Sequence, residues 1–591
     1  MSQKLTRARQ YISVPSINDL IPTSLQKLVS EPQFILLFVL IVCYALLSIN
    51  NKSKTQLAHA RWGGAKERLA ARKLACQQIE EGQRLGKLAL FIGTPRGTRI
   101  EYEWDKPVLY LPSSPRTIYL ANCQKHLMII GSTGEGKSFS AVSPAYMSAV
   151  LQGTTIFFLD AKGHEVPSPA DQLVSFAVDR GYKVWYIDIE SELSSICNIM
   201  DFIESPVDSE NAHQLGDVLI RNFKIGQSDS GNSEYFALAG VQLMKAILLM
   251  AKDTPLTDLA TVHKILSLPN LIERLHNAKL PQVVKVAFDN FLSTAGAPET
   301  AAGVASTASL LLTRFMNPKV LRTFCGNSTM PLDFDGRNLV VFKMNSRNKA
   351  ISAPLISATL EMLITRNIYR PRNNFLTVFG DEINSVFLPN LVDWLNQLRS
   401  SKLCFILGVQ SLGFLEKVYG KEAVSGILAG CGTQVIFAVN DNYTAEYYSK
   451  KLGEKEVKVQ QKSHSYGKNN NSHSSSDNLQ TRPLMTLDEF DQLLTGQCVI
   501  LSSGSTDGVR KKIPLKQKVN IPTRDIKALK KSEADWKHVQ PKMLARNERL
   551  FKENGNKKLA LEEFYRSREQ LAYNLLPTAI EQETRELISS Y

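Results

Sequence analysis

The sequence predicts an α/β fold, in which a mostly parallel sheet carries helices on both faces. Two observations predict it. Short apolar runs alternate with helix-compatible segments in 51–203 and again in 335–515, whereas 204–334 has helical periodicity and almost no strand signal. A G-x-x-x-x-G-K-S pattern joins one apolar run to a helix-compatible run at 131–138. Parallel strands need crossover connections, so this alternation favours a sheet covered on both faces.

Length and composition set the class of protein. The 591 residues exceed one ordinary domain. The formal net charge of +14 suggests an anionic partner, either nucleic acid or a membrane surface, although ordinary surface charge would give the same value. The 8 cysteines are scattered without a C-x-x-C pair. They therefore predict reduced thiols in a cytosolic domain, and they disfavour a disulfide framework or a zinc site.

The N-terminal part predicts a membrane anchor. A polar tail, residues 1–33, precedes an uncharged apolar segment, residues 34–50, which is at the short end for a transmembrane helix. A buried core helix and a signal peptide are the alternatives, but the long polar tail and the lack of a small-residue cleavage site disfavour a signal peptide. Basic residues follow the segment and hardly precede it, which places the large C-terminal part in the cytoplasm: Lys52, Lys54, Arg61, Lys66 and Arg68 against Lys27.

The first strong motif follows the apolar run 126–130. Its glycines let the backbone wrap closely around a polyphosphate with N–H groups directed inward. Lys137 can reach the β- and γ-phosphates, and the Ser138 hydroxyl can bind Mg²⁺. A chance glycine-rich turn is the alternative, which the flanking strand and helix disfavour. The motif predicts an ATP and Mg²⁺ site made by Gly131, Ser132, Thr133, Gly134, Glu135, Gly136, Lys137 and Ser138.

A second motif supplies the acids that such a site needs. The apolar run 375–379 leads into Asp381 and Glu382. We expect Asp381 to hold the Mg²⁺ together with Ser138, and Glu382 to polarise the attacking water. An ordinary strand-to-helix turn with acidic caps is the alternative. Asp160 also ends an apolar run, but Lys162 follows it closely, so we expect a supporting role there.

Two further residues are candidates for sensing or stabilising the γ-phosphate. Gln410 ends the run 403–409, which we expect to lie beside the phosphate-loop strand. Arg399 precedes this run and could reach a neighbouring subunit's nucleotide as an arginine finger. A solvated strand end and an ordinary surface cation are the alternatives for these two residues.

The remaining segments predict the domain order. We expect a charged helix over 55–85 and a strand-rich region from 88 to 120, both within a first nucleotide-binding part, 51–203. An all-helical inserted domain, 204–334, and a second nucleotide-binding part, 335–515, come next. Within the latter, 463–478 is a polar low-complexity stretch that predicts a mobile loop. A charged helical tail, 516–591, ends the chain.

Together these motifs carry a resemblance to the type IV secretion coupling proteins of the TraG/TraD class. The sequence between about 59 and 514 is similar to that class in the order of its motifs. Ala161 and Ile199 stand where the class has proline, and His164 is inserted. The motifs that resemble the class are His59–Trp62, the loop 126–138, Asp160–Glu165, Arg180–Val184 with Asn198, Phe379–Glu382, Val409–Ser411, Asn440–Asp441 with Ala445, Ser449–Gly453 and Arg482–Met485.

The resemblance implies a RecA-like P-loop ATPase domain interrupted by an all-alpha domain. It also implies a homohexamer at the bacterial inner membrane and the delivery of relaxase-bound single-stranded DNA to type IV secretion channel proteins. It supports Lys137, Glu382, Gln410 and Arg399 as catalytic residues. Members of the class usually have two transmembrane helices, whereas one is visible here, so the N-terminal tail is expected in the periplasm.

Two alternatives remain open. A coupling receptor for protein effectors, without DNA transport, would need the same ATPase core. A membrane-anchored DNA pump of the FtsK and HerA group is disfavoured by the inserted helical domain and by His59–Trp62. The two half-sites disfavour a purely structural scaffold.

Overall fold

The computed structural model describes residues 59–82, 86–103, 106–165, 167–225, 233–398, 400–467, 470–558 and 560–582. These residues form two compact units, one from Arg61–Leu452 with Met485–Tyr591 and one that contains Gly453–Leu484. The predicted tail 1–33, the predicted transmembrane helix 34–50 and Arg399 lie outside the described residues. The larger unit holds both motifs of the predicted ATPase site.

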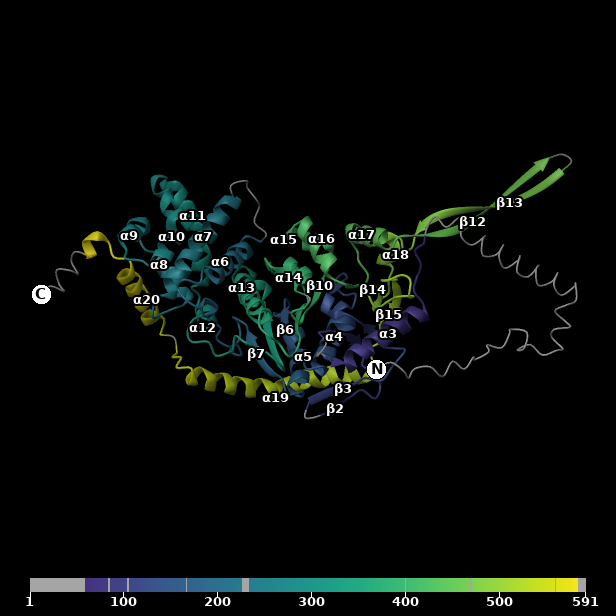
Figure 1. Ribbon diagram of the computed structural model, residues 1–591, viewed down its shortest axis with the longest axis horizontal. Coiled ribbons are helices and arrows are strands. Elements are labelled where there is room, and N and C mark those ends of the chain that lie inside the picture. The colour runs from purple at the N-terminus through teal and green to yellow at the C-terminus, as the bar shows by residue number, and fades with distance from the viewer. Residues whose placement is uncertain are drawn as a thin grey trace, which may run out of the picture. The chain divides into compact units, whose positions relative to one another are not determined.

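A nine-stranded sheet forms the centre of the larger unit (Figure 1). Seven neighbouring strands are parallel and two at one edge are antiparallel, which confirms the predicted α/β fold. Most of the parallel strands are buried along their whole length, as expected of a sheet covered on both faces. In sheet order the strands are β15 (Leu515–Lys518), β14 (Gln497–Leu501), β11 (Thr433–Ile436), β5 (Leu127–Ile130), β10 (Leu403–Val409), β9 (Leu376–Gly380), β6 (Thr155–Asp160), β8 (Asn338–Lys343) and β7 (Lys183–Ile187).

Helices connect these strands. The core of the unit combines apolar side chains of the strands with those of α4 and α5, and it includes Tyr146 and Phe158. These two rings meet edge to face, 5.8 Å apart. The connecting helices are α4 (Ser143–Leu151), α5 (Pro169–Val178), α13 (Lys349–Ile368), α14 (Leu391–Gln397), α15 (Leu412–Tyr419), α16 (Lys421–Gly430), α17 (Asn442–Leu452) and α18 (Leu487–Asp491).

A block of helices interrupts the sheet between β7 and β8. No strand occurs in its described residues, and α6 packs against α7 and against α13. One described helix, Tyr235–Lys252 within α7, is long and apolar enough to cross a membrane, but 61% of it is buried inside the protein, as for a core helix. The block comprises α6 (Ser209–Lys224), α7 (Ser233–Lys252), α8 (Leu259–Leu266), α9 (Leu271–Asn277), α10 (Gln282–Leu292), α11 (Pro298–Phe315) and α12 (Pro318–Phe324).

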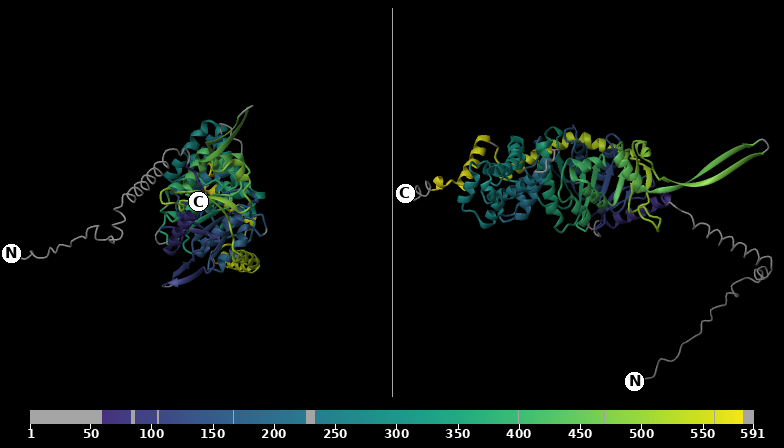
Figure 2. Two further views of the ribbon diagram at one scale, coloured as in Figure 1. Left: turned by 90° about the vertical axis from the view of Figure 1, so that its right-hand side faces the viewer. Right: turned by 90° about the horizontal axis from the view of Figure 1, so that it is seen from above.

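Both ends of the larger unit are packed onto this framework. At the start, α3 (Ala65–Glu80) covers the antiparallel pair of β1 (Leu90–Ile92) and β4 (Ile118–Leu120). Strands β2 (Arg99–Glu103) and β3 (Lys106–Tyr110) form a separate hairpin. At the end, α19 (Thr523–Glu553) packs along α5 and α20 (Leu561–Leu575) packs against α8 (Figures 1 and 2). The C-terminal helices therefore contact both the sheet region and the helical block.

The second unit is a long antiparallel hairpin, β12 (Glu454–Gly467) and β13 (Asn470–Pro483). The predicted loop over 463–478 is therefore wrong for its described residues. Polar composition does not prevent the backbone from pairing. Because each strand satisfies the N–H and C=O groups of the other, the pairing extends from Glu454 opposite Pro483 to Gly467 opposite Asn470.

Candidate active site

The predicted phosphate loop follows β5 and is held by the strands on both sides of it. The Gly131 N–H donates to the Val409 carbonyl at 3.2 Å, and the Ser132 N–H donates to the Ala438 carbonyl at 2.9 Å. A Cβ at Gly131 would lie 2.8 Å from the Cβ of Phe437, so only glycine fits this close approach. The loop is therefore fixed at its start by β10 and by the end of β11.

The middle of the loop has the backbone that the glycines predict. Gly134 and Gly136 have φ values of 89° and 80°, in the region that favours glycine. A π-helical turn, Ser138–Val142, comes directly after the loop and leads into α4. Such turns are frequent at functional sites. The first N–H groups of this helical segment make its start favourable for an anion.

Lys137 lies at the end of the loop and is only 7% exposed. Burial lowers the pKa of its ammonium group, while the charges of Asp381 and Glu382 oppose that shift. The two acids are therefore close enough to interact with Lys137. A phosphate placed at the loop would favour the charged form of this lysine in the same way.

The predicted metal-binding pair is in contact. Asp381 follows the end of β9, is 3% exposed, and accepts a hydrogen bond from the Ser138 hydroxyl at 3.1 Å. A hydroxyl beside a single carboxylate, next to a phosphate-binding loop, is the donor set that Mg²⁺ uses in P-loop proteins. The residues present therefore fit a nucleotide with Mg²⁺.

Glu382 and Gln410 form a second contact. The Gln410 Nε2 donates to the Glu382 carboxylate at 2.7 Å. The contact arises because β10 lies between β5 and β9, parallel to both, so the carboxyl ends of the three strands meet at one edge. The expected position of Gln410 beside the phosphate-loop strand is thus found, and its hydrogen-bond partner was not foreseen.

The other predicted loop residues lie at the rim. Thr133 is exposed and Glu135 is half-buried. The Ser132 hydroxyl accepts a hydrogen bond from the Asn440 N–H at 3.0 Å, which ties the loop to the segment before α17.

Asp160 holds local structure. It ends β6, and its carboxylate accepts hydrogen bonds from the N–H groups of Lys162 and Ala170, each at 3.0 Å. Burial raises the pKa of this carboxyl. Its two oxygens are used by the backbone of its own loop and of α5, which agrees with the supporting role that the sequence suggested.

Sequence reasoning missed a buried polar network behind this loop. Asp171 accepts hydrogen bonds from the Lys343 ammonium at 2.7 Å and from the Tyr186 hydroxyl at 2.9 Å. The only local signal is the capping box that Asp171 forms with Ser168 at the start of α5. The network links α5, β7 and β8 on the side of β6 away from the phosphate loop.

Parts of this chain are similar to known proteins. A family model described as the TraM recognition site of TraD and TraG matches residues 376–494, which include Asp381, Glu382 and Gln410. The chain is 30% identical over 126 residues to the coupling protein TraD of Escherichia coli (strain K12), a match that covers 21% of this chain and 18% of TraD. It is 24% identical over 295 residues to the conjugal transfer protein TraG of Rhizobium radiobacter, covering 47% of this chain and 45% of TraG. These matches span less than half the length of either relative.

Solved structures share the fold. The bacterial conjugative coupling protein TrwB matches 68% of this chain and 87% of its own, at 19% identity and a TM-score of 0.51. TrwB in complex with ADP and Mg²⁺ matches 68% of this chain and 86% of its own, at 19% identity and a TM-score of 0.50. Together the comparisons confirm the predicted resemblance to the type IV secretion coupling proteins.

Proposed function

We propose that this chain is the coupling ATPase of a type IV secretion or conjugation system, with a RecA-like motor domain and an inserted helical domain. One observation carries the proposal: side chains from the phosphate loop, β9 and β10 meet at a single sheet edge, with Ser138 on Asp381 and Gln410 on Glu382. The resemblance to TraD, TraG and TrwB, whose names describe coupling and conjugal transfer, supports it.

Each residue then has a defined role. Gly131–Ser138 holds the triphosphate of ATP, and Lys137 neutralises its charge. Ser138 and Asp381 hold Mg²⁺, which when bound neutralises charge on the phosphates. The binding of ADP and Mg²⁺ by TrwB supports these ligands. Glu382 orients and polarises the attacking water.

Gln410 positions Glu382. Its amide donates to the Glu382 carboxylate, which restricts the rotation of that side chain and links it to the end of β10. The Val409 carbonyl of β10 also accepts a hydrogen bond from the Gly131 N–H of the phosphate loop. A movement of this loop on cleavage of the γ-phosphate would therefore be transmitted to Gln410, the residue after Val409. Arg399, outside the described residues, is proposed as the arginine finger of a neighbouring subunit.

The assembly that we propose is a homohexamer at the bacterial inner membrane. Residues 34–50 would be its single anchor, with the tail 1–33 in the periplasm and the larger part in the cytoplasm. It would recruit relaxase-bound single-stranded DNA and deliver it to the secretion channel proteins. The net charge of +14 supports an anionic substrate.

The test of the site is ATP hydrolysis by the purified full chain. Lys137→Ala should lower ATP affinity and turnover together, because it removes the positive charge that neutralises the phosphates. Glu382→Gln should retain ATP binding and lower kcat by about 100-fold or more, since only the group that activates water changes. Glu422→Gln, on the exposed surface of α16 and outside the site, is the control and should retain most activity. Wild-type turnover in Lys137→Ala would reject the proposed site.

The alternative function is a coupling receptor for protein effectors that transports no DNA. It predicts ATP hydrolysis that single-stranded DNA does not stimulate at any salt concentration. The DNA-coupling function predicts stimulation that weakens steeply as salt rises, because phosphate contacts release counterions. Titration of single-stranded DNA at two salt concentrations separates the two.

A further inference from the structure

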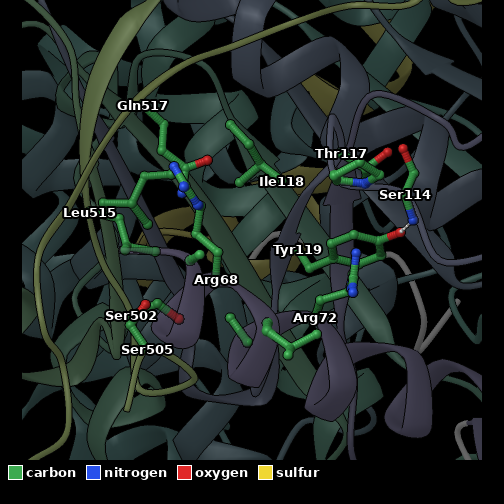
Figure 3. Close-up of a pocket in the computed structure, with 15 residues that line it drawn as sticks. Arg68, Arg72, Ser114, Thr117, Ile118, Tyr119, Ser502, Ser505, Leu515 and Gln517 are labelled. Carbon is green, nitrogen blue, oxygen red and sulfur yellow. Dashed lines mark hydrogen bonds between the residues drawn. The ribbon is translucent and has the colours of Figure 1, made fainter. Parts of the chain in front are cut away.

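A cavity of about 490 Å³ lies between α3, the segment that leads into β4, the edge strand β15 and its neighbour β14 (Figure 3). Its size is in the range of small-molecule sites. Strands β14 and β11 separate β15 from the phosphate-loop strand β5, so the cavity is distinct from the candidate active site. The proposed ATPase mechanism uses none of its lining residues.

Two arginines of α3 line this cavity. Arg68 and Arg72 are four residues apart and therefore on one face of the helix. Within the described part of the chain, neither guanidinium group makes an ion pair or a hydrogen bond. Glu67 on the same helix and Asp507 both form ion pairs with Arg61, each at 2.8 Å.

The described residues that line the cavity include no aspartate or glutamate. Two like charges at this spacing repel one another. An anion between the guanidinium groups would remove this repulsion, and the planar fork of arginine matches a phosphate well.

A buried hydroxyl also lines the cavity without a partner. Ser505 is fully buried, and its Oγ has no hydrogen-bond partner in the described structure. Buried hydroxyls of this kind are rare and unfavourable unless a ligand or water bonds them. The loop that carries Ser505 is fixed in place, since the Ser505 carbonyl accepts from the Ile513 N–H at 3.1 Å.

The rest of the lining is mixed. Figure 3 shows the side chains of Arg68 near Gln517 and of Arg72 near Tyr119. The Tyr119 hydroxyl accepts from the Ser114 N–H at 3.0 Å, so this side of the cavity is ordered. Apolar side chains form the remaining wall, among them Leu69, Ile118 and Leu515.

We propose that this cavity binds a phosphate ester, with the phosphate held by Arg68 and Arg72, a hydroxyl of the ligand bonded to Ser505, and its less polar part against the apolar wall. Two sources supply this chemistry. One is the glycerophosphate headgroup of an anionic phospholipid, and the other is a soluble phosphate ester. The cavity has both the charge and the apolar wall that the phospholipid needs.

Calorimetric titration of the detergent-solubilised full chain tests the proposal. The probes are dihexanoylphosphatidylglycerol, glycerol 3-phosphate and, as the zwitterionic comparison, dihexanoylphosphatidylcholine. We expect the phosphatidylglycerol to bind at least tenfold more tightly than the phosphatidylcholine. If glycerol 3-phosphate also binds, a soluble phosphate ester can fill the cavity. If glycerol 3-phosphate does not bind and the phosphatidylglycerol does, the ligand is the lipid headgroup.

Matched variants assign the binding to the cavity. Arg68→Ala with Arg72→Ala should weaken binding at least tenfold. Lys66→Ala with Lys73→Ala removes the same charge from exposed positions of the same helix and should change the affinity less than twofold.

Ser505→Ala should weaken binding without loss of folding, because no protein hydrogen bond is removed. Lys137→Ala changes the phosphate loop and not the cavity, so it should bind the probe as wild type does. This result is expected whether or not the ATPase proposal is correct, so the two proposals are tested separately. The proposal is overturned if no probe binds, or if the two double variants lose binding equally.

Discussion

At the scale of single residues, Glu361 is a fully buried carboxyl that the proposed ATPase mechanism does not use. One of its oxygens accepts hydrogen bonds from the Gln214 Nε2 at 3.1 Å and from the Asn390 Nδ2 at 2.8 Å. The other oxygen has no partner within the described structure. Burial raises the pKa of Glu361 to about 8. Glu361 is therefore protonated at neutral pH, and it joins α6 of the helical block to the segment that precedes α14.

This carboxyl predicts a pH-dependent stability. The ordinary pKa is 4.5, so between that value and about 8 the folded state holds a proton that the unfolded chain has lost. The stabilising contribution of the protonated form is complete below pH 4.5 and is lost as the pH rises through 8. Glu361→Gln imitates the protonated group. The free energy of unfolding of this variant, relative to wild type, should therefore increase from pH 5 to pH 8.5 by a few kcal/mol, on the order that the pKa difference implies. Thermal unfolding at several pH values measures it.

Glu210→Gln on the exposed face of α6 is the control, and its difference from wild type should not grow over this range. A Glu361→Gln difference that stays constant with pH would contradict the buried protonated carboxyl.

At the scale of elements, the approach of β10 to β9 decides the position of Asp381. Gly408 lies near the end of β10, and a Cβ there would be 2.2 Å from the Asp381 carbonyl oxygen. No side chain can occupy that space unless the backbone moves. The absence of a Cβ at Gly408 thus allows the two strand ends to meet and to bring Gln410 to Glu382.

Gly408→Ala should therefore displace the turn that carries Asp381 and Glu382. We expect a loss of ATP hydrolysis of about tenfold or more and a destabilisation of about 1–3 kcal/mol from overpacking. Gly413→Ala in α15 is the matched control, because the nearest atom to its Cβ is the Ser411 Oγ at 3.9 Å. Steady-state hydrolysis and thermal unfolding of both variants measure the effect, and unchanged activity in Gly408→Ala would reject it.

At the scale of the whole larger unit, the C-terminal helices connect the sheet region to the helical block. The Ser532 hydroxyl of α19 accepts from the Phe176 N–H in α5 at 2.9 Å. Arg568 of α20 forms an ion pair at 2.7 Å with Asp258, the N-cap of α8. The predicted charged tail therefore consists of helices that bind two separate parts of the fold, and they limit how far these parts can move apart.

Arg568→Ala should loosen the helical block. Asp258 is 3% exposed, and removing its partner leaves a buried carboxylate unpaired, which costs about 3–5 kcal/mol. Glu569→Ala breaks the more exposed pair with Lys264 on the same helix and should cost less than about 1 kcal/mol. Hydrogen exchange of the α8 amides measures both. Equal protection in the two variants would show that α20 does not hold the block.

Local patterns explain which parts of the site could be predicted. Gly131–Ser138 and the acids after β9 each need only a short stretch of sequence, because glycine conformations and strand ends are local properties. The Gln410–Glu382 hydrogen bond, the Asp171 network and the cavity beside α3 join residues from distant segments. No short pattern encodes them. The hairpin 454–483 was missed because backbone pairing needs no apolar side chains.

The sequence by itself determined the α/β class, the two ATPase motifs and the helical interruption, since periodicity and glycine placement specify local structure. The sequence also placed the run 403–409 beside the phosphate-loop strand. Only the tertiary structure decided that β9 lies on the other side of β10, which backbone groups the Asp160 carboxylate binds, and that the C-terminal helices join the sheet region to the helical block. Strand order and long-range burial depend on the packing of the whole chain. That packing brings Ser138 to Asp381 and places Arg68 and Arg72 at a separate cavity whose described lining includes no acidic residue.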